Sequence, residues 1–161
     1  SGTLTGTSGM TPPPIIAALE SNALAVWLRT SLAYPVLESV HLIGLATLFG
    51  SVLIIDMRLL GMIRHIGVGA LARGVLPWTW LGFLLAAGSG LCLFFARATE
   101  LIDNSVFLIK MLLIMSAGLN AAWLHSRGPL DTSSRQTRLQ AAFSLSIWLA
   151  VIVCGRWIAY V

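Results

Sequence analysis

Long apolar runs separated by short polar segments make up most of the chain after residue 34. The four runs extend from Pro35 to Leu60, between Arg73 and Arg97, from Val106 to Leu124, and from Leu139 to Tyr160. A helix needs roughly 20 apolar residues to cross about 30 Å of hydrocarbon, and each run meets that length. Because the polar connections are short, consecutive helices are expected to pack antiparallel. The pattern predicts an all-α protein, with a four-helix transmembrane bundle over residues 34–161.

A shorter amphipathic segment precedes the first run. Within residues 15–33 apolar side chains recur at helical spacing, whereas Glu20 and Asn22 lie in the middle of the segment. These polar residues disfavour a membrane span, so we predict an interfacial amphipathic helix with Trp27 as its aromatic anchor. We interpret residues 1–14 as a flexible tail that is in part an expression scar, and we exclude it from the fold.

Composition supports a membrane protein and excludes several soluble classes. Of the 161 residues, 57% are hydrophobic and 10% are charged, whereas soluble domains average about 25% charged residues. We therefore interpret the net charge of +4 as a topology signal and expect no nucleic-acid partner. Both cysteines lie in apolar runs, which excludes a disulfide scaffold and a cysteine-type zinc site.

The distribution of charge predicts the orientation of the bundle. The connections after the first and third helices contain six arginines and two aspartates, a net charge of +4. On the opposite side, four cations and four carboxylates cancel. Under the positive-inside rule the first side is cytoplasmic, so both termini face the periplasm. We expect a multi-pass protein of a bacterial inner membrane, in contact with the lipid bilayer.

Ionisable side chains at membrane depth are candidate functional groups, because burying them away from water is expensive. His41 lies in the first helix, and Glu38 precedes it by three residues on the same face. A carboxylate in this position can hold the imidazole and fix its tautomer. Antiparallel packing brings further polar or sulfur-containing side chains to the same end: Arg97, Lys110, Met111, Cys154, Arg156 and Tyr160.

Haem b ligated by His41 and Met111 is the first of three interpretations of this cluster. The two residues lie at matched depth on the first and third helices, whereas His65 and His125 lie at the cytoplasmic ends of those helices. Imidazole and thioether groups are a known axial pair for haem iron. Ligation by His65 and His125 is the weaker prediction, because solvated histidines are ordinary in interfacial loops.

A copper site is the second interpretation. Imidazole, thioether and thiolate groups suit Cu(I). No short sequence motif contains several of these residue types together. The candidate ligands are His41, Met111, Met115, Cys92 and Cys154.

A buried network of ion pairs and hydrogen bonds is the third interpretation. Such a network fixes the register of the helices or binds an anionic headgroup or a quinone. The side chains of such a network are also able to pair with one another, so that no ligand is needed. Its members would be Glu38, His41, Lys110, Arg156 and Tyr160.

Two further features concern helix packing. Gly82, Ala86 and Gly90 form a small-xxx-small stripe, which predicts a close helix contact within the bundle or in a homo-oligomer. Asp56 is predicted to point inward, with Asn120 of the third helix as its hydrogen-bond partner. We interpret that pair as a helix-pairing contact.

The chain resembles a family of bacterial four-helix inner-membrane proteins classed as a domain of unknown function. The resemblance covers nearly the whole chain after Pro14 and implies the fold but no activity. The first helix is also similar to copper-resistance D-type membrane proteins and small membrane b-type cytochromes, although the paired histidines of a bis-His cytochrome are absent. The family resemblance rests on Tyr34, Pro35, Glu38, His41, Gly50, the DMRLLG segment at 56–61, Pro77, Phe107, Lys110, Asn120 and the closing GRWIAYV.

Together these patterns predict a membrane anchor or electron-transfer subunit rather than an enzyme acting alone. Its site near His41 would bind a redox cofactor or a quinone-like ligand and would serve a periplasmic redox partner. The alternatives are a copper-handling membrane protein and a structural or assembly subunit. Nucleophilic hydrolysis is excluded, because no Ser, His and Asp converge at one depth and no phosphate-binding loop is present.

Overall fold

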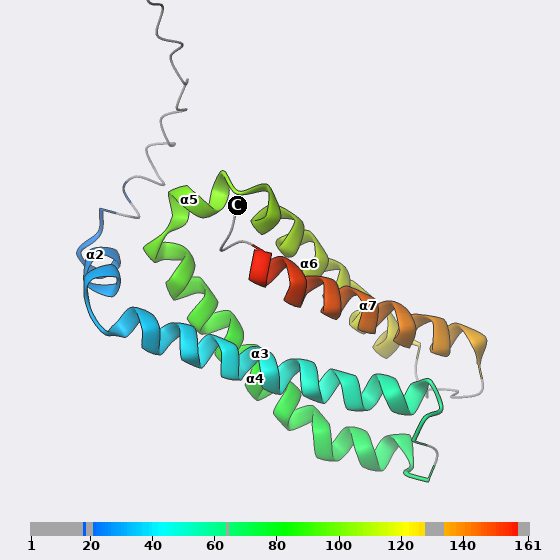
Figure 1. The fold of residues 1–161 in the computed structure, drawn as a ribbon. Coiled ribbons are helices and arrows are strands. Elements are labelled where there is room, and N and C mark those ends of the chain that lie inside the picture. The colour runs from blue at the N-terminus through cyan, green and yellow to red at the C-terminus, as the bar shows by residue number, and fades with distance from the viewer. Residues whose placement is uncertain (1–17, 19–20, 64, 128–133, 158–161) are drawn as a thin grey trace, which may run out of the picture.

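The computed structural model describes residues 18, 21–63, 65–127 and 134–157, and Figure 1 shows this part of the chain as a set of helices. Each of the four long helices is long and apolar enough to cross a membrane. The predicted all-α four-helix bundle is therefore confirmed. The long helices are α3 (Ala33–Leu59), α4 (Val68–Ala96), α6 (Ser105–Ser126) and α7 (Arg135–Trp157).

Two short helices accompany the four long ones. Helix α2 (Ala23–Thr30) lies within the segment predicted to be an amphipathic helix, and the Trp27 side chain is 57% exposed. The tail and residues 15–17 and 19–20 lie outside the described residues. Helix α5 (Ala98–Ile102), between α4 and α6, was not predicted. It is too short to produce a helical hydrophobic period that can be recognised in a sequence.

All four long helices begin earlier than the apolar runs indicated, and the difference is largest for α4 and α7. Helix α4 begins at Val68, before Arg73, and α7 begins at Arg135, before Leu139. An uncharged run marks the part of a helix that lies in hydrocarbon, whereas the helix itself continues into the polar interface, where arginine is tolerated. The predicted end of the last helix, Tyr160, lies outside the described residues.

The closest helix contact is the crossing of α3 with α4. A Cβ atom added at Gly82 would lie 2.5 Å from the backbone nitrogen of Leu48, and one added at Gly44 would lie 2.6 Å from that of Ala86. Only glycine permits this approach, so the predicted close packing of the small-residue stripe is confirmed. The stripe contacts α3 within the chain.

The four long helices form two antiparallel pairs. Helix α3 packs mainly on α4, α6 packs on α7, and α7 contacts α3 to join the pairs. A small buried cluster of Ala117, Ile147 and Val151 lies between α6 and α7. Large apolar side chains such as Leu84 and Leu119 remain exposed on the outer faces. An apolar outer surface is what contact with lipid requires.

The bundle has two ends that differ in chemistry. The His41 end contains the beginnings of α3 and α6 and the ends of α4 and α7. The Asp56 end is opposite and contains the other terminus of each long helix. Figure 1 shows α5 at the His41 end, whereas the chain turns from α3 into α4 at the Asp56 end.

Candidate functional site

His41 of α3 is hydrogen-bonded across the close crossing with α4. Its Nδ1 lies 2.9 Å from the backbone oxygen of Ala86 and 3.2 Å from the Ser89 hydroxyl. The Ser89 hydroxyl in turn donates to the carbonyl oxygen of Leu85. Because the Ser89 hydrogen is engaged with Leu85, the Ser89 oxygen remains able to accept a hydrogen bond from the imidazole.

These contacts determine the tautomer of the imidazole. A carbonyl oxygen only accepts hydrogen bonds, so the Nδ1 atom of His41 must carry the hydrogen that lies between it and Ala86. In the neutral ring, Nε2 then has a free lone pair. No hydrogen bond joins Nε2 to another described residue. Metal-ligating histidines are commonly oriented by such a hydrogen bond from the second ring nitrogen.

Gly90 provides the space that the His41 ring occupies. A Cβ atom at this position would lie 3.0 Å from Cε1 and 3.3 Å from Nδ1 of the ring. The third member of the small-residue stripe therefore admits an imidazole, whereas Gly82 admits the backbone of α3. This packing restricts the position of the ring, and the hydrogen bond to Ala86 sets its tautomer.

Lys110 of α6 brings a cation to the same site. Its ammonium group interacts electrostatically with His41 of α3 and with Cys154 of α7. A Cβ atom at Gly155 would lie 3.4 Å from Nζ of Lys110, so the ammonium group packs against the backbone of α7. All four long helices thus contribute to this site.

A second polar group lies at the rim of the His41 end. Arg97, which follows the last residue of α4, forms an ion pair of 2.7 Å with Glu100 of α5. The Arg97 guanidinium also donates a hydrogen bond to the Tyr34 hydroxyl, and this bond raises the pKa of Arg97 above its usual value. Arg97 therefore connects the beginning of α3 to the end of α4.

Glu38 does not hold the imidazole as expected. Its side chain is exposed, and it forms no hydrogen bond or ion pair with the described residues. The partners of His41 are instead Ala86 and Ser89, and the packing partner is Gly90. Ala86 and Gly90 were identified only as packing residues, and a backbone carbonyl acceptor has no residue-type signature in the sequence.

The sulfur-containing candidates are spread over α4, α6 and α7, and their predicted role as ligands stays a prediction. Met111 is 37% exposed and Met115 is 66% exposed, both on α6. Cys92 and Cys154 are free, half-buried thiols on α4 and α7. Among the described residues, no three or more His, Cys, Asp or Glu side chains are close enough together to share a metal ion.

The remaining candidates lie near the end of the chain. Arg156 is an exposed residue of α7 that has an interaction of its own. Tyr160 lies outside the described residues, so its predicted place in the network stays a prediction.

At the Asp56 end, the structure corrects the expected partner of Asp56. Asn120 donates instead to the backbone oxygen of Gln140, at 3.3 Å. The polar side chain that interacts with the Asp56 carboxyl is Ser144 of α7. Asp56 does point inward, as predicted, because it is buried.

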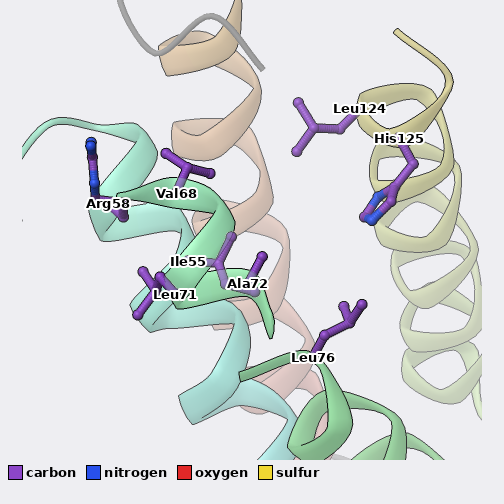
Figure 2. Close-up of a pocket in the computed structure, with 8 residues that line it drawn as sticks. All are labelled: Ile55, Arg58, Val68, Leu71, Ala72, Leu76, Leu124 and His125. Atoms are coloured by element: carbon purple, nitrogen blue, oxygen red, sulfur yellow. The ribbon is translucent and has the colours of Figure 1, made fainter. Parts of the chain in front are cut away.

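The two other histidines are not paired at the Asp56 end. His65 is exposed in the turn between α3 and α4, and Nδ1 of His125 lies 3.1 Å from the carbonyl oxygen of Ala121. His125 borders an apolar pocket of about 80 Å³ between α3, α4 and α6 (Figure 2). Arg58 also borders this pocket, and its Nε donates to the backbone oxygen of Ile66.

Four apolar helices that are able to span a bilayer, with the carboxyl group of Asp56 buried among them, define a multi-pass membrane protein. The chain belongs to the family of unknown function DUF6644, whose model matches residues 30–161. The match includes all four long helices. The resemblance to an uncharacterised family is therefore confirmed. No curated protein and no solved structure matches the chain.

Proposed function

We propose that the protein binds a quinone-like ligand at the His41 end and acts as a membrane anchor or electron-transfer subunit for a periplasmic redox partner. The observation that carries the proposal is the hydrogen bond from Nδ1 of His41 to Ala86, which leaves Nε2 with a free lone pair in a ring that interacts electrostatically with Lys110. The excess of arginine at the Asp56 end supports a bacterial inner-membrane location with both termini in the periplasm.

The two side chains match the two redox forms of a quinone. The Lys110 ammonium group is a donor for a quinone carbonyl oxygen, and Nε2 of His41 is an acceptor for the hydroxyl of a hydroquinone. Both lie on helices that are apolar enough to cross a bilayer, into which a lipophilic ring partitions. In this proposal the chain supplies the binding site, the redox partner exchanges the two electrons of the quinone–hydroquinone couple, and water exchanges the two protons.

The geometry favours a quinone over haem or copper. Successive residues on a helix point about 100° apart, so Lys110 and Met111 leave α6 in different directions. Lys110 is the residue that interacts with His41, and Met111 is partly exposed. A copper site would need its sulfur ligands around the imidazole, and the half-buried Cys154 interacts instead with Lys110.

Binding of a water-soluble short-chain benzoquinone to the protein in lipid nanodiscs tests the proposal. Isothermal titration is expected to show saturable binding that weakens at least tenfold in His41→Ala. The matched control is His125→Ala, which removes an imidazole at the opposite end and should leave the affinity unchanged. Equal affinity in His41→Ala and in the unmodified protein would overturn the proposed site.

Absorbance and metal analysis of the same preparation separate the alternatives. A Soret band that disappears in His41→Ala would show that His41 binds haem, and it would contradict the quinone proposal. Stoichiometric copper that is lost in Met111→Leu would establish the copper-handling alternative. The quinone proposal expects neither signal.

A further inference from the structure

Asp56 is a buried carboxyl group in the last turns of a membrane-spanning helix, far from the site described above. It is 4% exposed, and its Oδ2 atom has no hydrogen-bond partner among the described residues. The proposed quinone site makes no use of it. Intramembrane carboxyl groups are expensive to retain, so they are candidate functional groups.

The surroundings of Asp56 contain a single polar side chain that interacts with it in the described part of the chain. This is Ser144 of α7, which is itself buried. Ser51, one turn and a half earlier on α3, is also buried, but its hydroxyl donates to the carbonyl oxygen of Thr47. The Asp56 carboxyl therefore has one hydroxyl group available and no backbone donor.

No cation of the described chain compensates a negative charge on Asp56. The only ion pair among residues 21–63, 65–127 and 134–157 is at the opposite end, between Arg97 and Glu100. Arg58, on the same helix, is bonded to the backbone of the following turn. The cations at this end of the helices that pack on α3 are exposed: Arg73 of α4 and Arg135 and Arg138 of α7.

A carboxylate in this position would be a buried charge without a counter-ion. Such a charge is penalised far more strongly than an unpaired neutral oxygen, even after relaxation of the protein. We propose that Asp56 is a proton-binding site of the membrane domain, which holds one proton between α3 and α7 at neutral pH, opposite the Ser144 hydroxyl.

The same geometry disfavours a metal cation as the occupant. Calcium takes six to eight oxygen ligands and magnesium requires a full octahedron. One carboxyl group and one hydroxyl group are far fewer than that, and the carbonyl groups of a helix interior are engaged in its backbone hydrogen bonds. A proton needs only the carboxyl group.

Labelling with dicyclohexylcarbodiimide tests this proposal on the unmodified protein. The reagent partitions into apolar regions and forms a stable N-acylurea with protonated carboxyl groups. At neutral pH we expect one adduct per chain, located at Asp56 by peptide mass spectrometry, and complete loss of the adduct in Asp56→Asn. Absence of an adduct at Asp56, with the reagent shown to be active on another membrane carboxyl protein, would overturn the proposal.

Two controls distinguish a bound proton from nonspecific labelling and from a bound metal cation. Glu38→Gln removes an exposed carboxyl group of the same helix and should leave the labelling unchanged. Replacing choline chloride by sodium chloride should also leave the labelling of Asp56 unchanged. If sodium protects Asp56 from the reagent, the site binds a metal cation and the proton-binding proposal is overturned. Neither result depends on whether a quinone binds at His41.

Infrared spectroscopy provides a second measurement. The difference between the spectra of the unmodified protein and Asp56→Asn should contain the carbonyl band of a protonated carboxylic acid at neutral pH. Carboxylate bands in its place would contradict the proposal. Asn is isosteric with the neutral acid, so the variant is expected to fold.

Discussion

The two ends of α3 show two ways of placing an ionisable side chain within a membrane bundle. At one end, His41 donates from Nδ1 to the Ala86 carbonyl and retains a second nitrogen without a partner among the described residues. At the other, Asp56 interacts with Ser144 and retains an oxygen that is likewise unpartnered there. The Lys110 ammonium group interacts electrostatically with His41, whereas no cation of the described residues forms an ion pair with Asp56. The first arrangement suits a polar ligand and the second suits a proton.

The surroundings of the two residues also differ in how many helices contribute polar groups. His41 lies where glycines bring α3 and α4 into backbone contact and where α6 and α7 add Lys110 and Cys154. The polar side chain that interacts with Asp56 is a single hydroxyl group, that of Ser144 on α7. Polar groups from four helices can recognise a ligand at several of its atoms. One carboxyl group with one hydroxyl group has enough partners only for a proton.

The largest expected effect is on the crossing that positions the His41 end. Gly82→Val places a side chain where a Cβ atom would lie 2.5 Å from the backbone of Leu48, so α3 and α4 must separate. Overpacking of this kind is expected to destabilise the bundle by about 1–3 kcal/mol or more, measured as a lower unfolding temperature in detergent.

Gly88→Val is the matched control for this change, because nothing lies within 4 Å of a Cβ atom there. It should unfold close to the temperature of the unmodified protein. Equal destabilisation by the two variants would show that the crossing is not the source of the effect.

The next effect in size concerns ligand binding. Lys110→Met keeps the length of the side chain and removes the ammonium group that interacts with His41. Loss of a charged hydrogen-bond donor is expected to weaken benzoquinone binding by about tenfold or more, which corresponds to about 1.4 kcal/mol in a titration. Arg127→Met, at the opposite end, is the control, and an equal loss there would point to a general charge effect.

A smaller effect is expected from crowding the imidazole. Gly90→Ala places a methyl group 3.0 Å from Cε1 of His41, so the ring must shift by a few tenths of an ångström. We expect benzoquinone affinity to fall by a few-fold while the fold is retained. Gly118→Ala has open space around its Cβ atom and should bind like the unmodified protein. Unchanged affinity in Gly90→Ala would mean that the ring position does not matter for binding.

The smallest effect is expected at the rim. Tyr34→Phe removes the hydroxyl that accepts a hydrogen bond from Arg97 but retains the ring. Because the Arg97 side chain is half exposed, the change in unfolding free energy should be below about 1 kcal/mol. A larger loss in a thermal unfolding experiment would indicate that the rim, rather than the glycine crossing, holds the His41 end together.

The sequence determines the spans better than it determines their rotation. Apolar runs locate all four long helices, and the glycine stripe correctly predicts a close contact. They do not determine which side chain of a helix faces which neighbour. Asn120 was therefore assigned to Asp56 although it bonds to Gln140 of α7.

The candidate site shows the same limit. The depth of His41 in the membrane follows from its place in the first run, but its partner is a carbonyl group, which every residue has. Glu38 was preferred because a carboxylate three residues away is visible in a sequence. Ser89 lies on the stripe-bearing helix one residue before Gly90, and only the crossing angle of α3 and α4 shows that it meets the ring.

The most direct test of the central claim is nitrogen-15 NMR of the protein labelled in its histidines. The chemical shifts of His41, assigned with His41→Ala, should show a hydrogen on Nδ1 and an unprotonated Nε2. Addition of hydroquinone should shift the Nε2 resonance and leave that of His125 unchanged. A hydrogen on Nε2 in the neutral ring, or an Nε2 resonance that does not respond to the ligand, would contradict the account.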